Sequence, residues 1–414
     1  LECKNVYRPA RVISYDKESG ELMLHNYMDF DDLKDYVKIS YELTQDGLVI
    51  SKGKLPEVSV APHSEGKTNL KINVPENGKC YLKLIYHLKK ELPLLDEDHI
   101  LGFDEIEVSK EDTKCKLAEK WIPKTVVDSE LQVNENDTQI HIKGREFAYT
   151  IDKRTALFTE MKFAGREYLN HPMELNIWRA PTDNDMYIKS EWKKAHYDKA
   201  YTRAYTTEVV QGKHGVKITS HASVVAETVQ KILDVTITWK IEAAGKIDAD
   251  IAVTKDDEFP DLPRFGVRMF LDKKLSAVRY FGMGPQESYC DKHQAASHGL
   301  YQANVDDLHE DYIRPQENGS HYDCEYVELN NSRYGIVVSA ENAFSFNASY
   351  YTQEELEEKT HNYELTESDS VVFCVDYALN GIGSNSCGPV VLEQYRFDDV
   401  LFRFQFTLIP YIKG

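Results

Sequence analysis

The feature that most constrains this chain is an alternation of apolar and polar side chains with a period of two residues. It is clearest in five segments rich in β-branched and aromatic residues: Val37–Tyr41, Tyr81–Tyr86, Val235–Ile241, Phe344–Asn347 and Leu401–Phe406. Successive side chains of a strand point to opposite faces of a sheet. The pattern therefore predicts antiparallel strands with one buried face.

Turn sequences separate these segments at spacings that suit β-sandwiches. The clearest are Gln45-Asp46-Gly47, Glu76-Asn77-Gly78 and Ala244-Gly245-Lys246. Asp, Asn and Gly favour turns because they tolerate left-handed backbone conformations or bond to their own backbone. Strands and turns together predict an all-β fold.

Helical signals are few and short. Thr352 precedes Glu355 by three residues at the start of an acidic segment that ends at Glu358. This spacing predicts a capping box, in which the Thr352 hydroxyl accepts from the Glu355 amide and the Glu355 carboxylate reaches back. A second short helix is expected from Ser190 to Tyr197. Neither helix is long enough to organise a fold.

Composition and charge narrow the possible partners. The chain has 414 residues, of which 42% are hydrophobic and 29% charged, as in ordinary soluble domains. Its net charge is −20, with Lys and Arg scattered among acids, which argues against nucleic acid and suits a neutral sugar. No apolar run approaches a membrane span and the N-terminus lacks a signal pattern, so no membrane partner is expected.

The seven cysteines are odd in number and widely spaced, without a CxxC pair. This pattern favours reduced thiols over a disulfide framework or structural zinc, and it predicts a cytoplasmic location. His293 and His298 lack a third ligand at a suitable spacing, so we expect no metal and no cofactor in this chain.

The alternation breaks between Lys110 and Glu130, where charges are mixed and core positions are few. We therefore predict a first sandwich over residues 1–115, a linker over 116–127, and a second domain over 128–414 made of two large stacked sheets. Because the chain opens at Leu1 without a methionine, we expect it to be a piece of a longer protein.

Three motifs are more specific than the strand pattern. They are Arg179–Asp185, Phe281–Asp291 and Arg314–Gly319, and in that order they resemble signatures of the β-galactosidases of glycoside hydrolase family two. Gly381–Pro389 resembles the closing motif of that family, and Asp98–Phe103 is the best match nearer the N-terminus. The resemblance extends over the whole chain.

The resemblance implies the C-terminal portion of such an enzyme: an immunoglobulin-like β-sandwich followed by a galactose-mutarotase-like β-supersandwich. It implies that the two carboxylates for retaining hydrolysis of terminal β-galactosides such as lactose lie on an absent TIM barrel. Magnesium, with sodium as a second candidate, would bind to the whole enzyme. The implied partners are the N-terminal catalytic portion, the galactoside and further copies in a homo-oligomer.

One dipeptide, Asn134-Glu135, could imitate the acid/base motif of the family. Its surroundings predict a polar turn before a strand, with no βα repeats nearby. We therefore expect no catalytic residue in this chain.

The resemblance also suggests residues that contact sugar. The loop Met186–Trp192 would reach the rim of the active site, and Cys387 stands where better known members carry a tryptophan on which sugar stacks. Tyr395 or Phe397 could replace that ring. The expected rim residues are Asp185, Met186, Tyr187, Glu191, Trp192 and Cys387. Residues on the concave face that could contact sugar are Arg179, Glu287, Arg314, Glu317 and Asn318.

Each of these residues also has a purely structural interpretation. Arg179–Asp185 could be a salt-bridged loop anchor, Phe281–Asp291 a strand-to-loop passage, and Cys387 a buried thiol. An alternative function is a freestanding carbohydrate-binding or aldose-epimerase-like protein, although we find no His and Glu placed convincingly for epimerase chemistry. A naturally separate small subunit is a further possibility.

The predicted linker gives a first testable expectation. Limited proteolysis should cut between residues 110 and 130, because this segment is charged and poor in core positions, and should leave a stable piece of about 285 residues. Mass spectrometry of the fragments would locate the cut. A chain that resists cleavage there as one indivisible core would contradict the predicted boundary.

Overall fold

Antiparallel sheets make up most of the protein, as the sequence predicts. The computed structural model describes residues 1–110, 113–121 and 131–413. Its α-helices are all short: α1 (Glu2–Val6), α2 (Leu33–Tyr36), α3 (Ile188–Lys194) and α4 (Gln353–Glu358). No helix in these residues has the length and apolar character needed to cross a membrane. The all-β class is therefore confirmed.

The chain divides into two compact units. The first contains Leu1–Leu117 with Phe281–Pro285 and His293–Tyr301, and the second contains Ala118–Tyr280, Gln286–Lys292 and Gln302–Gly414. Residues 122–127 of the predicted linker lie outside the described residues. The predicted domain boundaries therefore stay a prediction.

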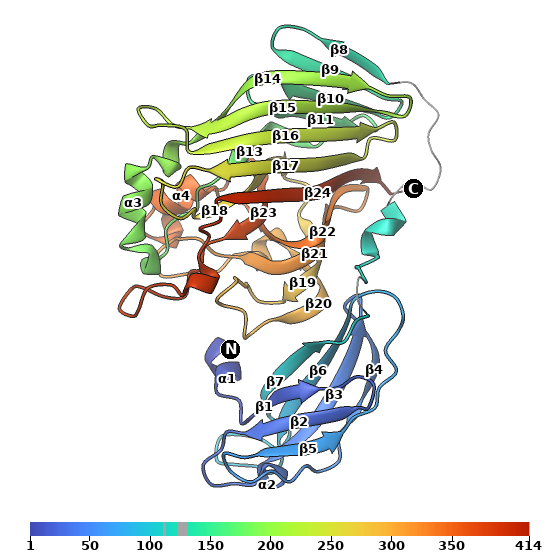
Figure 1. Ribbon diagram of the computed structural model, residues 1–414, viewed down its shortest axis with the longest axis vertical. Coiled ribbons are helices and arrows are strands. Elements are labelled where there is room, and N and C mark those ends of the chain that lie inside the picture. Colours follow the sequence, from blue (N-terminus) through green and yellow to red (C-terminus); the bar gives the residue numbers. More distant parts are fainter. Residues whose placement is uncertain (111–112, 122–130, 414) are drawn as a thin grey trace. The chain divides into compact units, whose positions relative to one another are not determined.

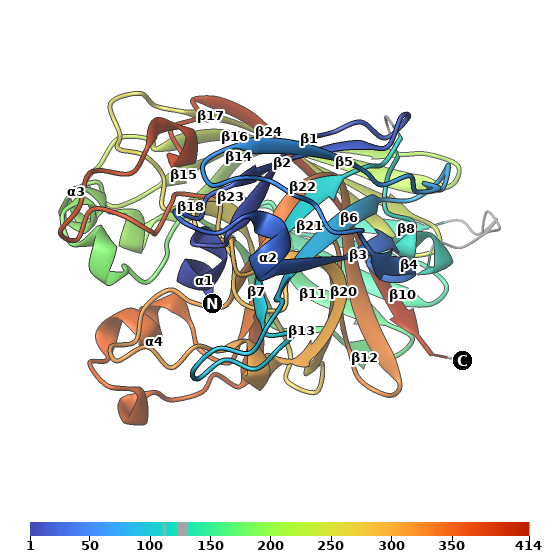
Figure 2. The same cartoon turned by 90° about the horizontal axis from the view of Figure 1, so that it is seen from below.

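The first unit is a sandwich of two antiparallel sheets. One sheet contains β1 (Ala10–Tyr15), β2 (Glu21–Asn26) and β5 (Glu65–Asn69), which lie side by side in Figure 1 and Figure 2. The other has the order β4 (Leu48–Lys54), β3 (Val37–Gln45), β6 (Cys80–Leu88) and β7 (Ile100–Glu107). Buried Leu22 and Leu24 of one sheet and Leu82 and Leu84 of the other belong to one core cluster. The sandwich is held by apolar burial between the sheets.

The turn between β3 and β4 explains why the sequence carries Asp46 and Gly47 there. Their φ angles are 47° and 79°, both in the left-handed region that suits a two-residue hairpin. A Cβ on Gly47 would also lie 2.1 Å from the backbone nitrogen of Leu300, within the same unit. The position therefore requires glycine.

The second unit stacks a large sheet against a smaller one. The large sheet runs in the order β13 (Leu169–Asn176), β18 (Arg264–Asp272), β23 (Ser370–Leu379), β22 (Tyr334–Ser349), β24 (Leu401–Ile412), β17 (Ile247–Lys255), β16 (Leu233–Glu242), β15 (Gly215–Val225) and β14 (Tyr201–Gln211). The long strands β14 to β17 and β24 lie next to one another in Figure 1. β21 (Ser320–Asn330) adds to β22, and β19 (Ala277–Gly284) and β20 (Ser297–Asn304) extend the same sheet.

The smaller sheet has five strands: β12 (Arg166–Glu167), β11 (Leu157–Phe163), β10 (Phe147–Asp152), β9 (Gln139–Lys143) and β8 (Gln132–Glu135). Asn134 and Glu135 thus form the end of a strand, and the predicted turn at this dipeptide is wrong. The pairing of β8 with β9 extends through Glu135, opposite Ile140. Polar side chains can occupy this strand because it lies at the edge of its sheet.

Aromatic side chains join the two sheets of the second unit. The ring of Phe158 on β11 meets the ring of Trp239 on β16 edge to face, with centroids 4.9 Å apart. Nε1 of Trp239 donates to the carbonyl of Ala156 at 2.8 Å, and the Tyr149 hydroxyl donates to the carbonyl of Gly245 at 2.7 Å. Burial of these large rings stabilises the stack while their polar atoms stay bonded. The supersandwich of two large stacked sheets is confirmed.

The two predicted helices form with small differences. Thr352 caps α4 and accepts from the Glu355 amide at 3.1 Å, as expected. The Glu355 carboxylate accepts from the Thr366 amide at 2.7 Å. It therefore ties α4 to a following loop rather than completing the capping box. The other helix, α3, starts at Ile188, and a 3-10 turn follows over Tyr197–Lys199.

Candidate functional site

The first motif is built around a buried ion pair. Arg179 follows β13 and is fully buried, and Asp185 is 3% exposed. Nε of Arg179 donates to Oδ2 of Asp185 at 3.1 Å, and Nη2 donates to Oδ1 at 2.7 Å. Oδ2 also accepts from the Thr182 amide at 2.9 Å. These bonds give the segment 179–185 the geometry of a loop anchor.

The same guanidinium holds the start of the closing motif, about 200 residues away in sequence. Nη1 of Arg179 donates to the carbonyl oxygen of Asn380 at 2.5 Å, and Nη2 donates to that of Gly381 at 3.1 Å. The side-chain Nδ2 of Asn184 donates to the carbonyl of Ile382 at 2.6 Å. The first and last motifs therefore meet through hydrogen bonds to backbone carbonyls.

The second motif contributes two carboxylates. Asp291 accepts from the backbone amides of Ile382 at 3.0 Å and Gly383 at 2.8 Å. Glu287 accepts from the amide of Gly319, in the third motif, at 2.8 Å. Carboxylates that accept from backbone N–H groups form strong charge-assisted bonds. These two residues join the second motif to the closing motif and to the third.

The third motif bonds directly to the first. The Glu317 amide donates to the carbonyl of Ala180 at 3.0 Å. The Asp183 amide donates to Oε1 of Gln316 at 3.1 Å. Residues from four segments that are far apart in sequence, among them Glu287 and Asp291 of the second motif, therefore form one cluster in the second unit.

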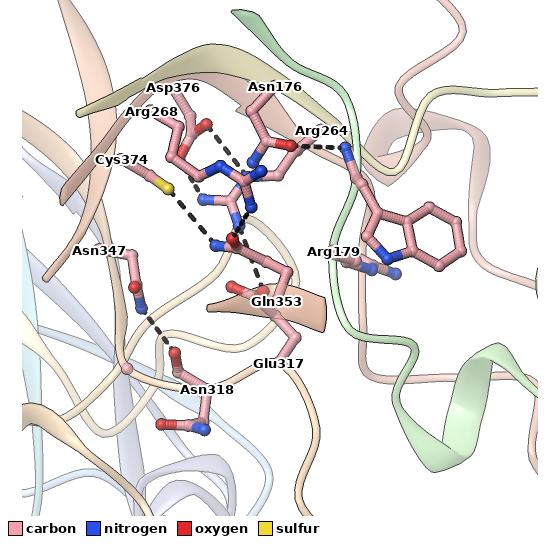
Figure 3. A network of polar contacts seen from close by, with 12 residues as sticks. Asn176, Arg179, Arg264, Arg268, Glu317, Asn318, Asn347, Gln353, Cys374 and Asp376 are labelled. Atoms are coloured by element: carbon pink, nitrogen blue, oxygen red, sulfur yellow. Dashed lines mark hydrogen bonds and ion pairs between the residues drawn. The ribbon is translucent and has the colours of Figure 1, made fainter. Parts of the chain in front are cut away.

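Behind this cluster lies a second buried ion network, shown in Figure 3. The guanidinium of Arg264 on β18 donates to Asp376 on β23 at 3.1 and 2.5 Å, and to Oε2 of Glu317 at 3.2 Å. Arg264 and Asp376 are fully buried. Burial raises the pKa of Asp376 and of Glu317, and the nearby Arg264 opposes that rise in both. Oε1 of Glu317 has no hydrogen-bond partner.

Asn318 adds a further buried connection. Its carbonyl accepts from Nδ2 of Asn347 at 2.6 Å (Figure 3). Its own Nδ2 donates to the carbonyl of Gln316 at 2.9 Å. Its side-chain oxygen accepts from the Glu310 amide at 3.1 Å. The third motif is thus fixed to β22 as well as to β18.

The loop after the first motif has an exposed and a buried part. Met186 and Tyr187 are 45% and 59% exposed. Glu191 is also exposed and pairs with Lys194 at 2.7 Å, which lowers the pKa of Glu191. Trp192 is fully buried, and its Nε1 donates to the carbonyl of Asp261 at 2.9 Å. Met186, Tyr187 and Glu191 therefore present side chains to an outside molecule, whereas Trp192 does not.

Cys387 lies on an exposed segment of the closing motif. The structure therefore does not support the interpretation of Cys387 as a buried thiol. Of the two aromatic residues that could replace the missing ring, Phe397 is buried and packs beside Tyr377. Tyr395 is half-buried, and its carbonyl accepts from the Gly381 amide at 2.8 Å.

The structure separates the expected sugar-contacting residues into two groups. Met186, Tyr187, Glu191, Arg314 and Cys387 are exposed and available for contact. The others are buried and bonded within the fold, so in this structure they support the loops and do not face a ligand: Arg179, Asp185, Trp192, Glu287, Glu317 and Asn318. Glu287 is further engaged by Lys292 and Tyr312.

Arg264 and Asp376 were missed by the sequence analysis. Asp376 ends the apolar run Val371–Val375, where an acidic side chain is unexpected on a central strand. A buried charge requires a partner. Asp376 could therefore have indicated that a buried arginine pairs with it, but the sequence does not show which arginine this is.

A cavity of about 740 Å³ borders the cluster. Its walls come from α3, α4 and the first and third motifs, and include Trp178 and Arg314. Nε1 of Trp178 donates to Glu357 at 3.2 Å. Both acidic and basic side chains line the cavity, so it has no single charge preference. Within residues 1–110, 113–121 and 131–413, no three His, Cys, Asp or Glu side chains gather as a metal site would require.

Comparison with family models shows the class of protein to which this chain belongs. Residues 143–408 match the family model described as β-galactosidase small chain, and residues 22–109 match that described as β-galactosidase domain 4. The chain belongs to the β-galactosidase family and corresponds to its C-terminal portion.

Individual relatives agree with this assignment. A β-galactosidase of Actinobacillus pleuropneumoniae is 44% identical over 99% of this chain, and one of Staphylococcus xylosus is 31% identical over 98%. The chain spans 39% and 40% of the lengths of these relatives. A galactose 1-epimerase structure from Lactobacillus acidophilus covers 69% of this chain and is itself 99% covered, with 8% identity and a TM-score of 0.36.

The buried network gives a testable ranking of two acids. Asp376→Asn should lower the free energy of unfolding by about 3–5 kcal/mol. The substitution replaces the carboxylate that pairs with the buried guanidinium of Arg264 by a neutral amide, and only the longer bond to Glu317 remains as an ionic contact. Glu317→Gln should cost less, because Glu317 makes a single longer bond and one of its oxygens is unpartnered. Urea unfolding of both variants would measure the difference.

The pH dependence provides a control on the same pair. Because the folded-state pKa of Glu317 is raised above its ordinary value of 4.5, the wild type should lose stability relative to Glu317→Gln as the pH rises from that value. Equal costs for the two variants, or a stability of the wild type relative to Glu317→Gln that does not change with pH, would contradict this account.

Proposed function

We propose that this chain is a non-catalytic part of a β-galactosidase that releases terminal β-D-galactose from β-galactosides such as lactose with retention. The two catalytic carboxylates would lie on a barrel portion outside this chain. The chain would supply loops to the rim of the active site and surfaces for assembly with the catalytic portion and with further copies.

The observation that carries this proposal is the way the exposed loops are supported. Met186 and Tyr187 follow directly on the Arg179–Asp185 pair, and Cys387 follows the backbone held by Arg179 and Asp291. A residue that completes a pocket on another domain must be presented outward from a rigid base. Buried polar bonds on the inner side and exposed side chains on the outer side suit this role.

The metal requirement would belong to the rest of the enzyme. Magnesium, and sodium as a second candidate, would be held near the catalytic carboxylates, and this chain would need no cofactor of its own. The described part of the chain contains no cluster of metal-ligating side chains. We also propose a cytoplasmic location, in keeping with an odd number of widely spaced cysteines that include no CxxC pair.

The division of labour can be tested by activity. This chain alone should show no turnover of a chromogenic β-galactoside, with or without magnesium, because it lacks the catalytic carboxylates. Adding the catalytic portion in trans should restore turnover if the two parts dock through a large interface. Metal-dependent hydrolysis by a clean preparation of this chain alone would overturn the proposal.

Cys387 can be tested in the complete enzyme. Cys387→Trp should tighten galactoside binding by about 1 kcal/mol, the scale of one aromatic contact, and would appear as a lower KM or inhibition constant. Cys387→Ala should leave the melting temperature nearly unchanged, because an exposed residue contributes little to core burial. If Cys387→Ala instead costs about 2 kcal/mol or more of stability, the residue is structural and the rim assignment fails.

A further inference from the structure

The second unit contains a second pocket, with a volume of about 320 Å³. Its walls come from Tyr289 and Cys290 of the second motif, from β21, β22 and β23, and from the segment between the closing motif and β24. Cys387 and Met186 are not among its lining residues. The pocket is therefore separate from the proposed rim.

Three half-buried tyrosines form its aromatic walls: Tyr322, Tyr377 and Tyr395. Burial raises the pKa of Tyr322 and of Tyr377 above the ordinary value of 10.0, so both phenols stay protonated at neutral pH. Tyr377 is held in place by stacking on Phe402, with centroids 4.8 Å apart. The pocket thus offers flat apolar faces with hydroxyl donors at their edges.

Polar groups stand between these rings. The carboxylate of Asp399 has no hydrogen bond or ion pair among the described residues, and it lies close enough to Tyr377 to raise the pKa of that phenol. Gln394 and Ser345 also line the pocket. A carboxylate and an amide provide acceptors and donors for neighbouring hydroxyl groups.

The lining disfavours two other kinds of ligand. An anion would meet the carboxylates of Asp323 and Asp399, while the lining supplies one cation, Arg396, whose Nε is committed to the carbonyl of Val391 at 3.0 Å. A covalent role for Cys290 is also disfavoured, because burial raises the pKa of this thiol to about 12.

We propose that this pocket binds a neutral monosaccharide, with its C–H face on the tyrosines and its hydroxyls on Asp399 and Gln394. Sugars combine an apolar C–H face with a ring of hydroxyls, and both features have counterparts here. The volume is at the lower end of the range for small-molecule sites, about 300–1,000 Å³, which suits one sugar ring rather than a chain. This site is additional to the rim role and does not depend on it.

Ligand-detected NMR with the chain of 414 residues tests the proposal. Saturation of the protein should transfer to the ring protons of methyl β-D-galactopyranoside or methyl β-D-glucopyranoside, most strongly on the C–H face. Asp399→Asn should weaken the binding about tenfold or more, because it removes charge-assisted bonds to the hydroxyls. Tyr395→Ala should weaken it about fivefold or more, as expected for one stacking contact.

Asp398→Asn is the matched control. Asp398 is the exposed neighbour of Asp399 but does not line the pocket, so this variant should bind within about twofold of the wild type. Cys387→Ala is measured beside it to report on the proposed rim. The melting temperature of each variant identifies any loss of binding that arises from unfolding.

Three results would overturn the assignment. The first is that neither glycoside receives saturation. The second is binding that Asp399→Asn and Tyr395→Ala leave unchanged; if Cys387→Ala removes it, the sugar sits at the rim, which would leave the proposed function intact. The third is displacement of the sugar by tetramethylammonium at equal concentration, which would identify a site for organic cations formed by aromatic rings and carboxylates.

Discussion

The arrangement of the motif loops depends on the fully buried guanidinium of Arg179. A guanidinium has five N–H donors in a planar fork, and here four bonds connect it to the carboxylate of Asp185 and the carbonyls of Asn380 and Gly381. Removing a charge from water is costly, and only such complete bonding compensates for it. A lysine has a single ammonium and could not contact all these oxygens in the same geometry. The bond pattern therefore explains why an arginine occupies this position.

A second buried arginine connects the motif loops to the sheet. Arg264 joins β18 to β23 through Asp376 and reaches Glu317 of the third motif. The Glu317 amide bonds to Ala180, next to Arg179. The two ion networks are thus connected through the backbone hydrogen bond between Glu317 and Ala180. The loops are held rigidly because their polar groups form hydrogen bonds to residues of the central strands.

This support has consequences for both proposed binding roles. Residues such as Met186 and Cys387 lie outside the network, so they can change without removing a buried bond. The segment from Gly381 to Phe397 begins at the Arg179 network and ends at the aromatic pocket. The carbonyl of Tyr395 accepts from the Gly381 amide, and Tyr395 also lines that pocket. One well-anchored segment thus contributes to the proposed rim and to the proposed monosaccharide site.

The sequence by itself determined the all-β class, the principal strands, the cap of α4 and the family, because these follow from local periodicity, from hydrogen bonds between near neighbours and from short motifs. It also suggested a salt-bridged loop anchor within Arg179–Asp185, although the structure was needed to show that Asp185 is the carboxylate that pairs with Arg179. Only the tertiary structure decided that Glu317, Asn318 and Trp192 are buried while Met186 and Cys387 are exposed. It alone revealed the pairing of Arg264 with Asp376, 112 residues apart. The physical reason is that burial and long-range ion pairing depend on which strands become neighbours in the sheet, and an alternating pattern specifies which face of a strand is apolar but not which strand lies beside it.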